Sequence, residues 1–184
     1  MFKKLGELKL GGVFGGYEII NQSADKMPQD LASATGIINE GLLGATYMPI
    51  WIVGKQVVKG INYLIIAKEI RSTKDQDTKI VAMIINLPPG SIGGKGATVV
   101  EIIEEAKLTD EIKVAFENAV KTLTGVAYKP IAFMGEQVVK GINYYYVAEA
   151  KVLYPGTQPY GVIICVNVFN GVTSIVSIEH ISWL

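Results

Sequence analysis

An eight-residue segment occurs twice in the chain without a single difference. Residues 56–63 read QVVKGINY, and residues 137–144 read the same, an offset of 81 positions from Gln56 to Gln137. The same offset aligns further identical residues: Gly44 with Gly125, Tyr47 with Tyr128, Pro49 with Pro130, Asn86 with Asn167 and Gly90 with Gly171. A repeat at a fixed period indicates one supersecondary unit that is used more than once. The sequence therefore predicts two homologous units, residues 1–92 and residues 93–184.

Within each unit, the pattern predicts one helix followed by an antiparallel meander of strands. In residues 109–125 apolar side chains recur at helical spacing, with Thr109 placed to cap the helix and Gly125 placed to end it. The equivalent segment, residues 28–42, has two internal glycines that lower its helix propensity, but the repeat favours a helix there as well. Stretches rich in β-formers predict the strands: residues 47–53, 61–70, 79–87, 128–134, 142–153, 161–169 and 173–181. We therefore expect an α+β fold in which each helix packs on an antiparallel sheet.

Residues 97–104 fit two places in this scheme. They are similar to residues 173–179, which would make them the last strand of the first unit. Their segment Glu-Ile-Ile at 101–103 also repeats the Glu-Ile-Ile at 18–20, which would make them the first strand of the second unit. Both alternatives stay open, and a strand shared by the two units would satisfy both.

Composition narrows the classes of function. Seventeen basic side chains balance seventeen acidic ones, which disfavours a nucleic-acid partner because such partners are held by an excess of basic charge. A single cysteine, Cys165, and a single histidine, His180, exclude an internal disulfide scaffold and a zinc module. No apolar stretch approaches the roughly 20 residues of a membrane-spanning helix. We expect no cofactor, no membrane partner, and a cytoplasmic chain, or an extracellular one if a leader has been removed.

Few residues suit catalysis, and each has a plainer structural interpretation. Cys165 and His180 would make a nucleophile and its base, but Cys165 lies within the apolar strand VIICV, where a cysteine packs as a small hydrophobe. Asp75 and Asp77 lack the neighbouring carboxylates and the glycine of a calcium loop, which indicates a solvated turn. The three tyrosines at 144–146 are expected to alternate between the two faces of a strand. We find no credible acid–base pair and do not expect an enzyme.

The repeated motif resembles one found in a family of protease inhibitors. Residues 56–60 and 137–141 both fit the Q-x-V-x-G signature of cystatins and stefins, and the Ile-Asn-Tyr that follows continues as in those inhibitors. Gly15-Gly16 precedes the first helix, where cystatins have an N-terminal glycine, and Gly93-Gly94 has a similar place before the second helix. Leu87-Pro88 matches the Leu-Pro of the second hairpin loop in stefins. The resemblance covers nearly the whole chain and implies two tandem cystatin-like units.

The resemblance implies a wedge that enters the active cleft of a papain-like cysteine protease without covalent chemistry. It assigns the protease contact to the following residues: Gly15, Gly16, Gln56, Val57, Val58, Lys59, Gly60, Leu87, Pro88, Gln137, Val138, Val139, Lys140 and Gly141. The second unit departs from the pattern because Val168-Phe169 stands in place of Leu-Pro, so the first unit is the expected inhibitor if only one binds. The alternative is a non-inhibitory structural or assembly module that retains the duplicated fold.

The strands carry one further expectation. Residues 61–70 and 79–87 are apolar on both faces, whereas a sheet covered by one helix normally has a polar second face. An exposed apolar sheet would promote association. We therefore expect the second face of each sheet to be covered, either by the other sheet or by a second copy of the chain in a homo-oligomer.

Overall fold

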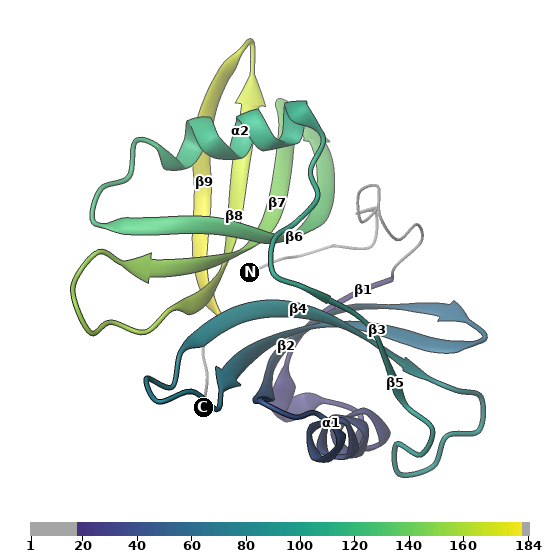
Figure 1. Cartoon of the computed structure of the whole chain (residues 1–184). Helices are drawn as coiled ribbons and strands as arrows, with labels where there is room; N and C mark the ends of the chain where they lie inside the picture. Colours follow the sequence, from purple (N-terminus) through teal and green to yellow (C-terminus); the bar gives the residue numbers. More distant parts are fainter. Residues whose placement is uncertain (1–17, 182–184) are drawn as a thin grey trace. The chain divides into compact units, whose positions relative to one another are not determined.

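The computed structural model describes residues 18–181 and is α+β, with two antiparallel sheets and two α-helices (Figure 1). The described chain divides into two compact units, an N-terminal unit of residues 18–104 and a C-terminal unit of residues 105–181. Each unit contains one sheet and one α-helix, which confirms the predicted combination of a helix with an antiparallel sheet. Gly15 and Gly16, two of the expected contact residues, lie outside the described residues.

The N-terminal unit has a five-stranded sheet in the order β1-β2-β3-β4-β5, so each strand pairs with its neighbour in sequence. The strands are β1 (Glu18–Ser23), β2 (Ala45–Val58), β3 (Gly60–Arg71), β4 (Thr78–Leu87) and β5 (Thr98–Ile103). A 3₁₀ turn, η1 (Ala24–Lys26), leads from β1 to helix α1 (Gln29–Gly41). This helix agrees with the one predicted at residues 28–42.

The stretch at residues 97–104 forms β5 and pairs with β4. Thr98 lies opposite Asn86, and Ile103 lies opposite Ala82. The strand is therefore the last one in the sheet of the N-terminal unit, and the C-terminal unit follows it from Glu105 onward.

The C-terminal unit has a four-stranded sheet in the order β6-β7-β8-β9. Helix α2 (Asp110–Val120) comes first, and the strands are β6 (Val126–Val139), β7 (Gly141–Val152), β8 (Tyr160–Phe169) and β9 (Val172–Ile181). Thr109 holds the N-cap position as predicted, and two acidic residues follow it in the first turn, where the helix dipole favours negative charge. Within the described part of this unit no strand precedes α2, so its sheet has no counterpart of β1.

The two sheets share their irregularities as well as their strands. β2 slips in register against β3 at two places, and β6 slips against β7 at the same two places 81 residues later. The slips fall at Pro49/Trp51, Ile52/Gly54, Pro130/Ala132 and Phe133/Gly135. A bulge of this kind leaves one residue unpaired and bends its strand. The duplication thus extends to the backbone geometry.

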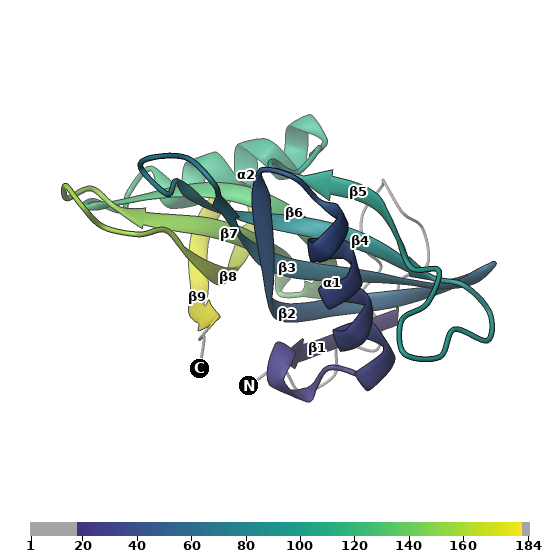
Figure 2. The same cartoon turned by 60° about the horizontal axis from the view of Figure 1, so that its bottom comes forward.

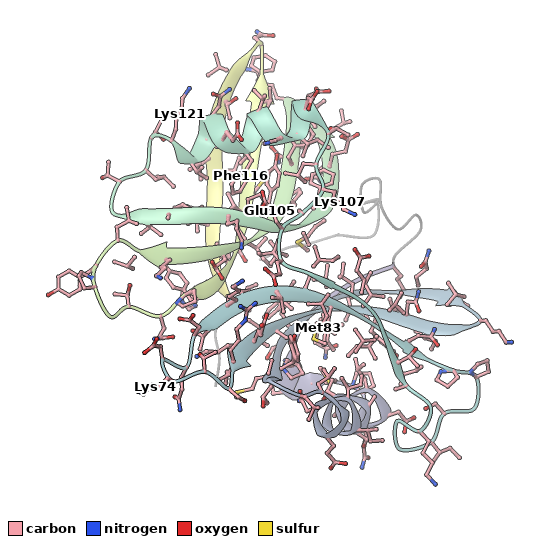
Figure 3. All side chains as sticks on the ribbon, in the orientation of Figure 1. Lys74, Met83, Glu105, Lys107, Phe116 and Lys121 are labelled. Atoms are coloured by element: carbon pink, nitrogen blue, oxygen red, sulfur yellow. The ribbon has the colours of Figure 1, made fainter. Side chains whose placement is uncertain are left out.

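Each helix buries one face against the sheet of its own unit (Figure 2). The buried helix residues recur at spacings of three and four: Leu31, Ala34 and Ile38 in α1, and Ala115, Phe116 and Ala119 in α2. In the N-terminal unit the sheet contributes Met83 to this core, and in the C-terminal unit Phe116 packs edge-on against Tyr146, with 4.9 Å between ring centroids (Figure 3).

The face of each sheet that points away from its own helix is buried too. In the central strands these residues are Leu64, Ile66, Ile80, Ala82 and Ile84, and Tyr145, Val147, Ile163 and Cys165. Tyr144 and Tyr146 belong to the helix-side core while Tyr145 does not, which confirms the alternation expected for the three tyrosines. Burial on both faces explains why these strands are apolar throughout.

Candidate functional site

Both copies of the repeated motif lie at the apex of a long hairpin. In the N-terminal unit, Val58 at the end of β2 pairs with Gly60 at the start of β3, which leaves Lys59 alone in the turn. The C-terminal unit has the same arrangement 81 residues later. We call residues 57–60 the N-terminal tip and residues 138–141 the C-terminal tip.

The valines at the two tips are exposed apolar side chains. Val57 and Val138 are 80% and 81% exposed, and the valines that follow them, Val58 and Val139, are 43% and 45% exposed. The lysine at each apex is exposed as well. Full burial of a valine in a partner would contribute roughly 1.5 kcal/mol or more, so each tip is a narrow apolar ridge suited to a cleft.

Only glycine fits the last position of each tip. Gly60 and Gly141 have φ angles of 97° and 91°, a region that other residues rarely adopt. A Cβ atom on Gly60 would lie 2.1 Å from the carbonyl oxygen of Leu87, and one on Gly141 would lie 2.4 Å from that of Val168. The glycine in each Q-x-V-x-G motif therefore allows the first hairpin to press against the end of a neighbouring strand.

A pair of asparagines braces each tip from below. In the N-terminal unit, Asn86 Nδ2 donates to Asn62 Oδ1 at 2.8 Å and to the carbonyl oxygen of Lys59 at 3.5 Å. The C-terminal unit repeats both bonds: Asn167 Nδ2 to Asn143 Oδ1 at 2.8 Å and to the carbonyl oxygen of Lys140 at 3.3 Å. Sequence reasoning aligned Asn86 with Asn167 but assigned them no role. Their identity at the repeat offset, in strands otherwise apolar, was the available signal.

The second loop differs between the units. Leu87 is only 6% exposed and belongs to the core beneath α1, so of the predicted Leu87-Pro88 pair only the proline has a partly exposed side chain. In the C-terminal unit the equivalent loop is the short turn between β8 and β9. There the Lys140 ammonium lies 5.2 Å from the centre of the half-exposed Phe169 ring, a cation–π contact that ties the C-terminal tip to the second loop.

The first residue of the motif plays a supporting part in the C-terminal unit. Gln137 Oε1 accepts a hydrogen bond from the Tyr145 hydroxyl at 3.0 Å, across the β6–β7 hairpin. Gln56 is half-buried in the first hairpin. The structure thus gathers each copy of the motif, with Pro88 or Phe169, at one end of its own unit.

Cys165 and His180 do not form a catalytic pair. Cys165 lies opposite Ser177 in the β8–β9 ladder, whereas His180 lies opposite Val162 and stacks on Tyr160, with 4.6 Å between ring centroids. Cys165 is 1% exposed, and this burial raises the pKa of its thiol, although a hydrogen bond with Tyr145 acts in the opposite direction. A buried neutral thiol is a poor nucleophile, which agrees with the packing role expected for this cysteine.

We expect Cys165 to resist thiol reagents while the chain is folded. At pH 8, reaction with a chromogenic disulfide reagent should be at least 100-fold slower in buffer than in 6 M guanidinium chloride, because both burial and the raised pKa suppress the thiolate. Absorbance of the released thiolate measures the rate, with free cysteine as the control for the reagent. A native rate within tenfold of the denatured rate would contradict this prediction.

Two other kinds of site were sought in residues 18–181. No three His, Cys, Asp or Glu side chains gather there in a way that could hold a metal ion. Of the helices in the same range, none is both long and apolar enough to cross a membrane.

Comparison with known proteins adds no name to this geometry. No family model matches the chain, and no curated protein matches it.

Proposed function

We propose that the chain is a reversible, non-enzymatic inhibitor of papain-like cysteine proteases, built from two cystatin-like units whose hairpin tips enter the active cleft. The observation that carries the proposal is the pair of exposed valines at each tip, with Val57 and Val138 about equally exposed. The resemblance of the motif to cystatins and stefins supplies the class of partner. The tips supply a ridge that is apolar and narrow.

The rigidity of the tips supports tight binding. Each tip is fixed by a two-stranded ladder, by a glycine pressed against the next strand and by an asparagine brace. A ridge that is ordered before binding loses less conformational entropy when it is immobilised in a cleft. Binding would involve no covalent bond, since the tips contain no nucleophile, and the protease would be occluded rather than modified.

The proposal is tested by titrating papain with the full chain while a fluorogenic substrate reports residual activity. Val57→Asp and Val138→Asp place a charge on an exposed side chain without touching the glycine or the asparagine brace. Each is expected to weaken inhibition by its own unit about 100-fold, because a charge desolvated in an apolar contact costs about 3 kcal/mol. Inhibition should disappear in the double variant.

Leu43→Asp and Leu153→Asp serve as matched controls. Both leucines are exposed, at 98% and 69%, and lie at the ends of β2 and β7 far from the tips. Neither change should alter inhibition. Absence of inhibition by the unmodified chain at micromolar concentration, or inhibition that survives the double valine variant, would refute the proposed function. From the departures in the second unit, we expect Val57→Asp to have the larger single effect.

A further inference from the structure

The loop after β4 is longer than its counterpart after β8. The offset from Asn86 to Asn167 is 81, and those residues lie opposite Thr98 and Ser174, which are offset by only 76. The bulges in these ladders obey the same two offsets, since Ile84/Ile85 corresponds to Cys165/Val166. The N-terminal unit therefore carries five more residues between its last two strands than the C-terminal unit does.

The longer loop lies on the first turns of α1 (Figures 1 and 2). The backbone N–H of Gly93 donates to Asp30 Oδ1 at 2.8 Å. Gly94 is buried, and a Cβ atom added to it would lie 2.3 Å from the backbone nitrogen of Ala34 and 2.6 Å from its Cα. The loop backbone thus touches the helix backbone directly, which only glycine permits. Gly93 and Gly94 belong to this contact in the N-terminal unit and do not lead into the second helix.

The C-terminal unit leaves the same place open. Glu111 and Ala115 of α2 occupy the positions 81 residues after Asp30 and Ala34, but the short β8–β9 turn at Asn170 does not reach them. An open hollow of about 360 Å³ lies there instead. Its lining includes Asp110, Glu111, Ala115, Tyr144, Val168 and Gly171.

The hollow has the chemistry of the filled place. Ala115, Tyr144 and Val168 correspond at the repeat offset to Ala34, Tyr63 and Leu87, so its floor is small and apolar. One carboxylate oxygen of Glu111 accepts a hydrogen bond from the Tyr144 hydroxyl at 3.2 Å, which holds the carboxylate at the hollow. An ionised carboxylate has acceptor capacity for several donors, so Glu111 can also accept a backbone N–H, as Asp30 does.

We propose that this hollow binds an extended glycine-glycine segment of a peptide supplied in trans. The first glycine N–H donates to the Glu111 carboxylate, and the second glycine lies against the backbone of α2 at Ala115. The contact that Gly93 and Gly94 make with α1 is the template for both interactions. The site lies on the helix side of the sheet and does not depend on the proposed inhibition, because no residue of residues 138–141 lines it.

The test uses the loop of this chain as the probe. A synthetic peptide with the sequence of residues 88–97, PPGSIGGKGA, is titrated into the ¹⁵N-labelled full chain while amide shifts are followed by NMR. We expect saturable shifts at Glu111, Ala115 and Gly171. The same peptide with alanine in place of its second glycine, the equivalent of Gly94, should bind at least tenfold more weakly, because its methyl group would meet the helix backbone.

Two variants of the chain complete the test. Glu111→Gln keeps the size of the side chain but removes the charge on the acceptor, and it should weaken the glycine peptide about fivefold. Glu117→Gln, an exposed change elsewhere on α2, should leave binding unchanged. Equal binding of the alanine peptide, no effect of Glu111→Gln, or no shift at the hollow would overturn the proposal. Shifts there that depend on protein concentration without peptide would also overturn it, in favour of a second copy of the chain.

Discussion

Replacing Gly60 or Gly141 with alanine is expected to destabilise the unit that contains it by about 3 kcal/mol. Two causes add. A residue with a Cβ atom is strained at the positive φ of these positions, at about 1–2 kcal/mol. The new methyl group would also lie 2.1 Å or 2.4 Å from a backbone carbonyl oxygen that cannot turn aside as a side chain would. The first hairpin would have to lift from the neighbouring strand.

Gly44 and Gly125 provide a control within the same repeat. They too have positive φ angles, 88° and 82°, but nothing lies within 4 Å of a Cβ atom added to either. Alanine there should cost only the strain, about 1 kcal/mol. Amide hydrogen exchange read separately on β3 and β7 measures both effects, with the unmodified unit of each variant as its internal reference. Equal losses at the clamped and the open glycines would show that the close approach does not matter.

The strands and helices follow patterns that are local in sequence, and these were predictable. Periods of two and of 3.6 residues identify a strand or a helix without reference to the rest of the fold. The ends of β2 and β6 were not predicted, because Gly54 and Gly135 interrupt the pattern like turn residues. They lie at bulges, through which both strands continue as far as the tips.

The candidate site was predictable only in part, because some of its features depend on register. The repeat directed attention to both tips, but Leu87 was expected at a partner and is buried instead. Its alternation with Ile85 on the helix side of β4 was the available signal. The loop at Gly93 and Gly94 could not be placed from sequence, because its five extra residues are apparent only once the partners of Asn86 and Asn167 are known.

Tyr146→Ala is expected to destabilise the C-terminal unit by about 3–5 kcal/mol, the usual range for removing a large buried ring. The Tyr146 side chain is fully buried, packs on Phe116 of α2 and donates a hydrogen bond from its hydroxyl to the carbonyl oxygen of Ile112 at 2.8 Å. It is therefore the main attachment of α2 to the sheet. The equivalent residue in the N-terminal unit is Ile65, which has no such polar contact to offer.

Tyr146→Phe separates the hydrogen bond from the packing. It should cost about 1 kcal/mol near neutral pH, because the ring contacts survive and only one neutral hydrogen bond is lost. Hydrogen exchange of α2 and β7 measures the loss, and the exchange of α1 and β3 should not change. A cost above about 3 kcal/mol for the phenylalanine variant would show that the hydroxyl, and not the ring, attaches the helix.

The two chains should also differ in alkaline solution. Burial raises the pKa of the Tyr146 phenol, so the folded chain keeps this proton at pH values where the unfolded chain has begun to lose it, above about 10. The folded state then binds more protons than the unfolded state, and stability falls as the pH rises. Tyr146→Phe removes this contribution, so the alkaline loss of the C-terminal unit should be smaller by about 1.4 kcal/mol at pH 11. Equal losses between pH 9 and pH 11 in both chains would mean that the phenol is accessible to solvent.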